Sequence, residues 1–257
     1  MIVDAHVHVG SWNHTDFLGR ACELQGTLAE LGAAGVDGAA IMPSDRCDND
    51  ALLTEARSAI ALGHRGPLWF FPWVRPLGHE SQTGEGDLVW SEAHAGVITG
   101  FKIHPSLSRV KITDVGFRPY LELAEARGLV VLVHCGRWAE MAGWAHALEA
   151  AARHPKARFL LAHAGGDTPP NATHAAEAVF ERKLENVWFE FSGLREYWVI
   201  ERNVRRIGAA RYLLGSDYPL AHPRMYLGSL EAMALSSGER ALIAGGNAVS
   251  LFGESLR

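Results

Sequence analysis

The feature that most constrains this chain is a regular alternation of two kinds of segment from one end to the other. Short runs rich in β-branched and aromatic residues alternate with longer stretches rich in Ala, Glu, Arg and Leu. This rhythm predicts repeated parallel βα units. Eight segments have the composition of strands: Ile2 to His8, Val36 to Pro43, Leu68 to Arg75, Val97 to His104, Leu129 to Cys135, Arg158 to Ala164, Val187 to Phe191 and Tyr212 to Asp217.

The segments between these strands have the composition and length of helices. Several end at a glycine, the residue that most often terminates a helix. The signal is weakest between Gly78 and His94, where the third helix of the series is expected. The predicted helices are Asp16 to Leu31, Asp50 to Leu62, Phe117 to Arg127, Met141 to Arg153, Ala172 to Lys183, Tyr197 to Ile207 and Met225 to Leu235.

Eight parallel strands with intervening helices predict a closed (β/α)8 barrel, the TIM-barrel fold. Residues 1–257 then form a single domain, because no linker or low-complexity segment divides them. An open, doubly wound α/β sheet is the alternative. The absence of a GxGxxG motif after a strand counts against the dinucleotide-binding form of that sheet.

The composition is that of a globular protein, with 48% hydrophobic residues, 21% charged residues and a formal charge of −5. This charge provides no basic surface for nucleic acid or anionic lipid, so the expected partner is a small molecule. No apolar run approaches the roughly 18 residues of a membrane span, and a strand directly follows Met1, so we expect a cytoplasmic protein. Homo-oligomerisation is left open. The three cysteines form no CxxC pair, which argues against a disulfide framework.

Two histidines stand two residues apart at the end of the first predicted strand, in Asp4-Ala5-His6-Val7-His8. Side chains at this spacing lie on the same face of a strand, so His6 and His8 could bind one metal ion together. For an isolated His-x-His pair, two histidines in a hydrogen-bonded core are an equal alternative. The polar residues that end other strands decide between these interpretations.

In a parallel barrel the carboxyl ends of all strands meet at one face, so residues far apart in the sequence become neighbours there. Five of the thirteen histidines fall at such ends, where apolar side chains would be expected if they only filled the barrel. These end residues predict a site. They are His6 and His8 on strand one, Lys102 and His104 on strand four, His134 on strand five, His163 on strand six and Asp217 on strand eight.

Several segments in this order resemble the amidohydrolase superfamily. The resemblance is closest to the amidohydrolase-2 branch, which is related to aminocarboxymuconate-semialdehyde decarboxylase. It implies a distorted (β/α)8 barrel in which His6, His8, His134 and Asp217 are ligands of a divalent metal and His163 orients or deprotonates a water on that metal. The segments are His6-Val7-His8, Phe101-Lys102-Ile103-His104-Pro105, Val133-His134, Ala162-His163, Gly215-Ser216-Asp217-Tyr218-Pro219 and Gly246-Asn247-Ala248 with Leu251-Phe252.

The chemistry of this set agrees with such roles. Three imidazoles and a carboxylate suit Zn²⁺ and, less tightly, Mn²⁺ or Fe²⁺, and they leave one position for water. A bound Zn²⁺ lowers the pKa of that water to about 7. Asp217 could accept a proton from it, while His163 could stabilise an oxyanion or polarise a substrate carbonyl. Cys135 follows His134 and should point away from the site by strand alternation.

Lys102 allows a second arrangement of the metal site. In other members of the superfamily that this chain resembles, a lysine at the end of strand four is carboxylated and bridges two metals. Lys102 and His104 share a face of their strand, and we align His104 with the ligand layer, so Lys102 lies about 6–7 Å deeper in the barrel. From there its ammonium is better placed to donate to Asp217 or Glu190 than to bridge ions. The sequence therefore predicts one divalent metal per chain, most readily Zn²⁺.

The loops that follow the strands carry aromatic and guanidinium groups. Such groups suit a flat or ring-containing substrate that bears a carboxylate, although a loop arginine taken singly is as well explained by solvation. Arg195 is the predicted anchor because it closely follows strand seven. Trp12, His104 and Tyr218 are predicted to line the substrate site.

Three functions agree with these patterns. The favoured one is a metal-dependent hydrolase that uses an activated water on an amide, lactone or ester. The alternative is a metal-dependent non-oxidative decarboxylase of an aromatic or unsaturated carboxylic acid, because the same metal set can bind a carboxylate and a neighbouring oxygen. A non-catalytic barrel that only binds a ligand is the third.

Overall fold

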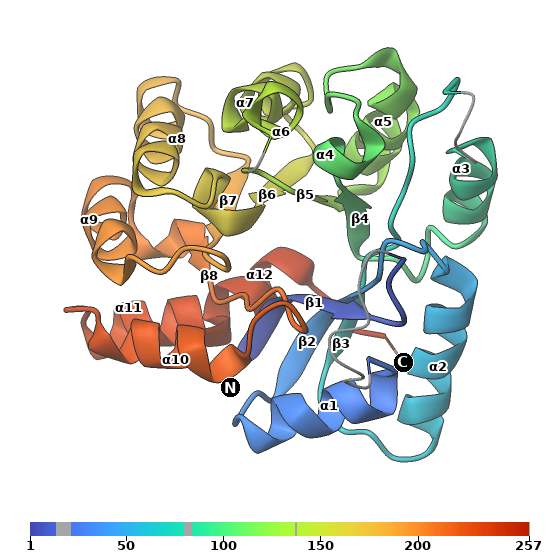
Figure 1. The fold of residues 1–257 in the computed structure, drawn as a ribbon, viewed down its shortest axis with the longest axis horizontal. Helices are drawn as coiled ribbons and strands as arrows, with labels where there is room; N and C mark the ends of the chain where they lie inside the picture. Colours follow the sequence, from blue (N-terminus) through green and yellow to red (C-terminus); the bar gives the residue numbers. More distant parts are fainter. Residues whose placement is uncertain (14–21, 80–83, 137, 257) are drawn as a thin grey trace.

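The computed structural model describes residues 1–13, 22–79, 84–136 and 138–256 (Figure 1). The described chain contains eight short strands, all paired in parallel. One sheet has the order β1-β2-β3 and the other the order β4-β5-β6-β7-β8. The strands are β1 (Val3–Val9), β2 (Gly38–Pro43), β3 (Leu68–Phe70), β4 (Gly100–Ile103), β5 (Val130–Val133), β6 (Arg158–Leu161), β7 (Val187–Glu190) and β8 (Tyr212–Leu213).

Two parallel bridges join the sheets into a barrel. Val7 of β1 pairs with Tyr218 beyond β8, and Trp73 beyond β3 pairs with Lys102 of β4. The joins are short because β3 and β8 are regular strands for only three and two residues. The fold is therefore the distorted (β/α)8 barrel predicted from the sequence.

Helices surround the strands on the outside of the barrel (Figure 1). Each β-strand from β1 to β7 is connected to the next through at least one of them. The helices are α1 (Leu24–Ala33), α2 (Asn49–Ala61), α3 (Gly84–Ala93), α4 (Pro105–Ser108), α5 (Arg118–Arg127), α6 (Ala139–Ala142), α7 (Trp144–Arg153), α8 (Pro169–Glu181), α9 (Tyr197–Ile207), α10 (Pro223–Ala232), α11 (Ser237–Ala241) and α12 (Asn247–Phe252).

The hydrophobic core has two layers. The larger layer fills the space between strands and helices and includes Val7 and Ile41. The smaller layer fills the barrel itself and includes Ala5 and Leu132. Phe252 of α12 packs on this inner layer, with its ring centroid 5.5 Å from that of Trp69. Arg158, at the start of β6, donates to the Leu251 carbonyl of the same helix, so α12 covers the amino ends of the strands.

An irregularity in β1 determines where its histidines point. The pairing of β1 with β2 shifts register between Asp4 and Val7. Ala5 belongs to the inner core layer and Val7 to the outer one, so the alternation of faces reverses between them. A bulge of this kind re-aims the side chains that follow it. As a result His6 and His8 both face the interior of the barrel.

Some segments differ from the prediction. The segment Met141 to Arg153 is two helices, α6 and α7, because the backbone is extended at Gly143. The chain after Leu235 contains α11, a π-helical turn and α12, none of which was predicted as a helix. The helix predicted from Asp16 to Leu31 begins at Leu24, because the backbone is extended at Glu23; residues 14–21 lie outside the described chain. The three thiols are free. Among the described residues, the helices are too short or too polar for any to cross a membrane.

Candidate metal centre

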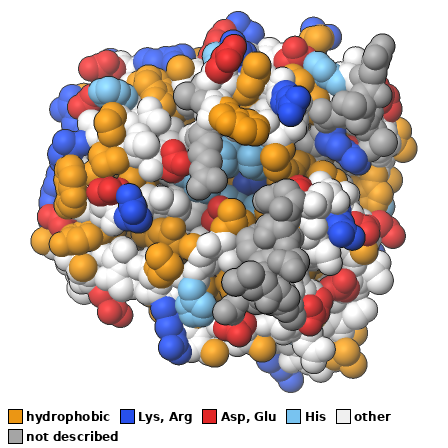
Figure 2. All heavy atoms as spheres, viewed as in Figure 1, with side chains coloured by type: hydrophobic (Ala, Val, Ile, Leu, Met, Phe, Trp, Pro, Cys, Tyr) orange, Lys and Arg blue, Asp and Glu red, His pale blue; other side chains and the backbone are white. Residues whose placement is uncertain are grey.

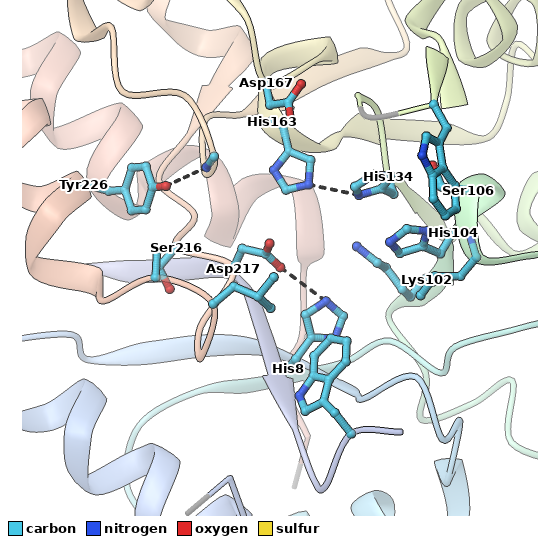
Figure 3. A pocket seen from close by; sticks show the side chains of 16 residues that line it. His8, Lys102, His104, Ser106, His134, His163, Asp167, Ser216, Asp217 and Tyr226 are labelled. Carbon is cyan, nitrogen blue, oxygen red and sulfur yellow. Dashed lines mark hydrogen bonds and ion pairs between the residues drawn. The ribbon is translucent and has the colours of Figure 1, made fainter. Parts of the chain in front are cut away.

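A cavity of about 550 Å³ opens at the carboxyl ends of the strands. Figure 2 shows histidine side chains at the bottom of a hollow on this face of the molecule, and Figure 3 shows how the labelled side chains converge on it. The described residues that line it are His8, Trp12, Lys102, His104, Ser106, Leu107, His134, Trp138, His163, Asp167, Gly193, Ser216, Asp217, Leu220, Ala221 and Tyr226.

Three potential metal donors meet at the floor of this cavity. The Nε2 atoms of His6 and His8 are 3.1 Å apart. Asp217 Oδ1 lies 3.2 Å from the first and 3.4 Å from the second. Asp217 has a φ of 59° and donates its backbone N–H to the His6 carbonyl, which fixes the end of β8 against β1. His6, His8 and Asp217 therefore form a compact group that could hold one ion.

The hydrogen bonds of the two histidines leave their Nε2 atoms free of protons. His8 Nδ1 donates to the Pro43 carbonyl at 2.8 Å, and His6 Nδ1 donates to Glu190 Oε1 at 2.9 Å. Burial lowers the pKa of both imidazoles, and for His6 the charge of Lys102 lowers it further. Burial raises the pKa of Asp217, but its interactions with His6 and His8 outweigh this and keep the pKa below its ordinary value.

This protonation pattern fits a divalent cation. Two lone pairs and a carboxylate oxygen within 3.4 Å of one another require positive charge beside them, which Lys102, 2.7 Å from His6 Nε2, supplies in this structure and a divalent cation would supply in its place. A histidine that donates its other ring N–H to a carboxylate or a carbonyl is also the usual arrangement of a metal ligand. Both β1 histidines have that arrangement.

His163 and His134 form a second pair beside the first. His163 follows β6 with a φ of 57° and lies under Gly193, where a Cβ atom would come within 2.9 Å of the His163 ring. Its Nδ1 donates to the Ser192 carbonyl at 3.1 Å. Its Nε2 lies 3.0 Å from Nδ1 of His134 (Figure 3). His163 also belongs, with His6 and Glu190, to a second group of side chains close enough to hold an ion.

Flat rings form one wall of the cavity. Trp73 and His104 stack with centroids 5.3 Å apart and planes 3° apart. His104 then stacks on His134 at 3.8 Å and 12°. His104 Nδ1 accepts the backbone N–H of Leu107 at the start of α4, so its proton is on Nε2. Burial keeps the pKa of His104 well below its ordinary value, so the ring is neutral.

Lys102 is fully buried between the ring wall and the β1 histidines. Its Nζ donates to His6 Nε2 at 2.7 Å, which differs from the predicted donation to Asp217 or Glu190. Burial lowers the pKa of this amine to about 8, although the charges of Asp217 and Glu190 act in the opposite direction. Because His104 follows on the same face, Lys102 is one pleat deeper, as the strand alternation predicts.

The structure brings most of the predicted site residues together but not all of them. The Arg195 side chain is 86% exposed and 3.9 Å from Glu196, so the predicted anchor does not line the cavity. The chain turns at Gly193 (φ 73°), and Leu194 rather than Arg195 faces the core. Tyr218 is also outside the lining, because its side chain packs in the outer core layer. The predicted residues at the cavity are His6, His8, Trp12, Lys102, His104, His134, His163 and Asp217.

Some residues of the site were not predicted to be part of it. Ser192 follows β7, and its hydroxyl contacts His163 Nδ1. Glu190 was predicted only as an acceptor for Lys102, whereas its carboxylate contacts His6 Nδ1. Ser192 could have been predicted as a site residue, because a serine and a glycine directly follow the predicted strand in Phe191-Ser192-Gly193. Tyr226 also lines the cavity. It lies on α10, and the position of that helix depends on the loop after β8. Cys135 belongs to the outer core layer and points away from the site, as predicted.

Comparisons with known proteins agree with this geometry. A 5-carboxyvanillate decarboxylase from Sphingomonas paucimobilis is 16% identical, with a TM-score of 0.73 over 99% of both chains. A 2,6-dihydroxybenzoate decarboxylase from Rhizobium is 15% identical, with a TM-score of 0.72 over 98% of both. A dihydroxybenzoic acid decarboxylase from a Polaromonas species, solved with manganese and 2-nitroresorcinol, is 15% identical, with a TM-score of 0.69 over 98% of this chain and 96% of that one.

A search of curated proteins found no match. The family model Amidohydro_2, described as Amidohydrolase, matches residues 3–253. That match spans both histidines of β1, the strand-end histidines and Asp217. The chain therefore belongs to the amidohydrolase-2 family of metal-dependent enzymes.

Proposed function

We propose that this chain is a metal-dependent non-oxidative decarboxylase of a small aromatic or unsaturated carboxylic acid. The observation that carries the proposal is that the candidate metal donors and a wall of stacked flat rings share one cavity. The flat side chains of Trp12, His104 and His134 line that cavity, and an aromatic lining of this kind suits a planar substrate. Donors at the floor suit the acid group of that substrate.

The similar solved structures support this choice of reaction. Four of them are decarboxylases by name, and one of the four is a 2,6-dihydroxybenzoate decarboxylase complexed with 2,6-dihydroxybenzoate. Another holds manganese and the planar inhibitor 2-nitroresorcinol. Each of these compounds combines one ring with oxygen substituents. We therefore favour decarboxylation over hydrolysis, which the sequence alone favoured.

In this proposal His6, His8, His134 and Asp217 hold one divalent ion. When bound, the ion would act as a Lewis acid that attracts the substrate carboxylate and a neighbouring oxygen. His104, whose Nε2 carries its proton, donates a hydrogen bond to the bound acid from the cavity wall. The ring of the substrate lies against the aromatic side of the cavity, where Trp12 excludes water.

We assign the proton transfer to His163. Decarboxylation breaks the bond between the carboxylate carbon and the adjacent carbon, and the electron pair stays on that adjacent carbon while CO₂ leaves. The same carbon then takes a proton. His163 holds one proton on Nδ1 for the Ser192 carbonyl, so the proton that it can deliver is on Nε2, the atom that faces His134 and the cavity. Solvent returns the proton afterwards.

Hydrolysis of an amide, lactone or ester is the second candidate, and Asp217 favours it. Its carboxylate lies within 3.4 Å of both β1 histidines and has a lowered pKa, so it is ionised and can accept a proton from a water at the same site. In that reaction His163 would stabilise the oxyanion that forms on the substrate.

A substrate panel tests the choice between the two reactions. The metal-loaded enzyme is given hydroxybenzoates and unsaturated acids in one arm, and lactones, esters and amides in the other. CO₂ release and acid production are followed in both. The proposal predicts CO₂ release in the first arm alone. Acid production from the second arm without CO₂ from the first would favour the hydrolase, and no turnover in either would favour a non-catalytic barrel.

A further inference from the structure

We propose that Glu190 is a positioning residue that fixes the tautomer of His6 and thereby sets the affinity of the site for its metal ion. Glu190 ends β7, and its side chain is fully buried beneath the candidate metal centre. It is absent from the cavity lining, so it acts through the residues that it contacts and not on the substrate.

The carboxylate of Glu190 receives hydrogen bonds from both histidine groups of the site. Its Oε1 accepts from Nδ1 of His6 at 2.9 Å and from the backbone N–H of His163 at 3.1 Å. The chain leaves room for it at Gly215, where a Cβ atom would come within 2.3 Å of Oε2. One side chain thus holds a metal ligand from β1 and the residue that follows β6 in fixed positions.

The remaining hydrogen bonds argue against Glu190 as a metal ligand. Ser192 donates its hydroxyl to Oε1 at 2.9 Å and its backbone N–H to Oε2 at 2.7 Å. With His6 and His163, Oε1 has three donors and Oε2 has one. An ion bound through Oε1, the oxygen that contacts His6, would have to displace these donors. In a metal site, Glu190 would therefore contact the ligand His6 and not the ion itself.

Fixing the His6 tautomer matters because only an unprotonated nitrogen binds metal. A neutral imidazole carries its proton on either Nδ1 or Nε2. Glu190 accepts from Nδ1, so Nε2 keeps its lone pair, which faces His8 and Asp217 and accepts from Lys102 in this structure. An ion must displace Lys102 from that lone pair. Without a strong acceptor at Nδ1, the ring that Lys102 leaves would carry its proton on Nε2 in part of the population and could not bind the ion. Loss of such a partner behind a ligand typically weakens metal binding by about 10–100-fold.

The test compares Glu190→Gln and Glu190→Ala with Asp87→Asn. Asp87 is a matched control, because it too is a buried carboxylate with several donors, all from Arg75. It does not line the cavity. Zinc and manganese dissociation constants are measured by competition with a chelator, and folding is checked by circular dichroism. Glutamine keeps the shape of the side chain, so Glu190→Gln carries the test if Glu190→Ala does not fold.

The proposal predicts about 10–100-fold weaker metal binding in the Glu190 variants and parental affinity in Asp87→Asn, even though Asp87→Asn is less stable. Nitrogen-15 spectra of the metal-free Lys102→Met protein, in which no amine donates to Nε2, should show one His6 tautomer with Glu190 present and a mixture with Glu190→Gln. Affinity within about threefold of the parent, or equal weakening in Asp87→Asn, would overturn the proposal. So would loss of an oxygen ligand from the spectrum of the Co²⁺-loaded Glu190→Gln variant, since Glu190 would then be a ligand. No readout depends on turnover, so the result is independent of the proposed reaction.

Discussion

Asp4 and Ser216 join the first and last strands of the barrel directly beneath the candidate metal centre. The Asp4 carboxylate accepts the Ser216 backbone N–H at 2.9 Å and its hydroxyl at 2.5 Å. The same carboxylate accepts the His6 N–H at 3.1 Å, within the bulge of β1. The buried Asp4 carboxylate therefore fixes the position of the β1 histidines relative to the turn that contains Asp217.

Replacing the hydroxyl should destabilise the fold. In Ser216→Ala, one oxygen of a buried carboxylate loses its donor, and we expect the free energy of unfolding to fall by about 1–3 kcal/mol. Urea denaturation of the metal-free protein measures this change. Ser58→Ala is the control, because that hydroxyl is exposed and donates to a backbone carbonyl instead of a buried carboxylate, and its loss should cost at most about 0.5 kcal/mol. Equal losses in the two variants would contradict the role of the Asp4–Ser216 pair.

Removing the β1 histidines should remove the metal. The variant His6→Ala/His8→Ala lacks two of the three donors that converge on the cavity floor, so its metal content and activity should both fall steeply. Metal should also no longer raise its melting temperature, since a ligand stabilises the state that binds it. His174→Ala, an exposed position on α8, is the control and should behave as the parent. Full metal occupancy in the double variant would refute the assignment.

His163 should be needed for turnover and not for metal. His163→Asn should reduce kcat by about 10²–10⁴-fold, the usual effect of losing a positioned acid or base, while the metal content stays near that of the parent. Elemental analysis and steady-state kinetics on the same preparation separate the two effects. If metal and activity disappear in proportion, His163 is a ligand.

Much of this site could be predicted because it follows from topology. Parallel strands bring their carboxyl ends to one face, so His6, His134, His163 and Asp217 could be grouped before any coordinates existed. The eight strands were found for the same reason, since their β-branched runs stand out from the helical segments. The joins at β3 and β8 could not be predicted, because the loss of ladder geometry there depends on closure of the whole barrel.

The features that were missed depend on three-dimensional contacts. Arg195 follows β7 at a spacing that suits an anchor, but the turn at Gly193 directs it to solvent. Glu190 was expected only as an acceptor for Lys102, because its contact with His6 joins two residues that lie 184 positions apart and that no local motif connects. The bulge in β1 could not be predicted either, because polar and apolar residues alternate along that segment as they do in a regular strand.

Lys102 should act as an amine and not as a bridge between metals. Its Nζ already donates to His6, so we expect Lys102→Met to keep one ion per chain while activity falls. Intact-protein and peptide mass spectrometry should show no added carboxyl group on Lys102, and bicarbonate should not affect activity. Activity that is lost when bicarbonate is removed and restored when it returns would establish the bridged, two-metal site.

The most direct test of the account is a titration of metal-free protein with Mn²⁺ or Zn²⁺, followed by CO₂ release from the best acid of the substrate panel. The account predicts no CO₂ without metal and a linear rise that ends at one ion per chain. In His6→Ala/His8→Ala the same titration should give no rise. A break at two ions per chain, or CO₂ release that does not depend on metal, would contradict the account.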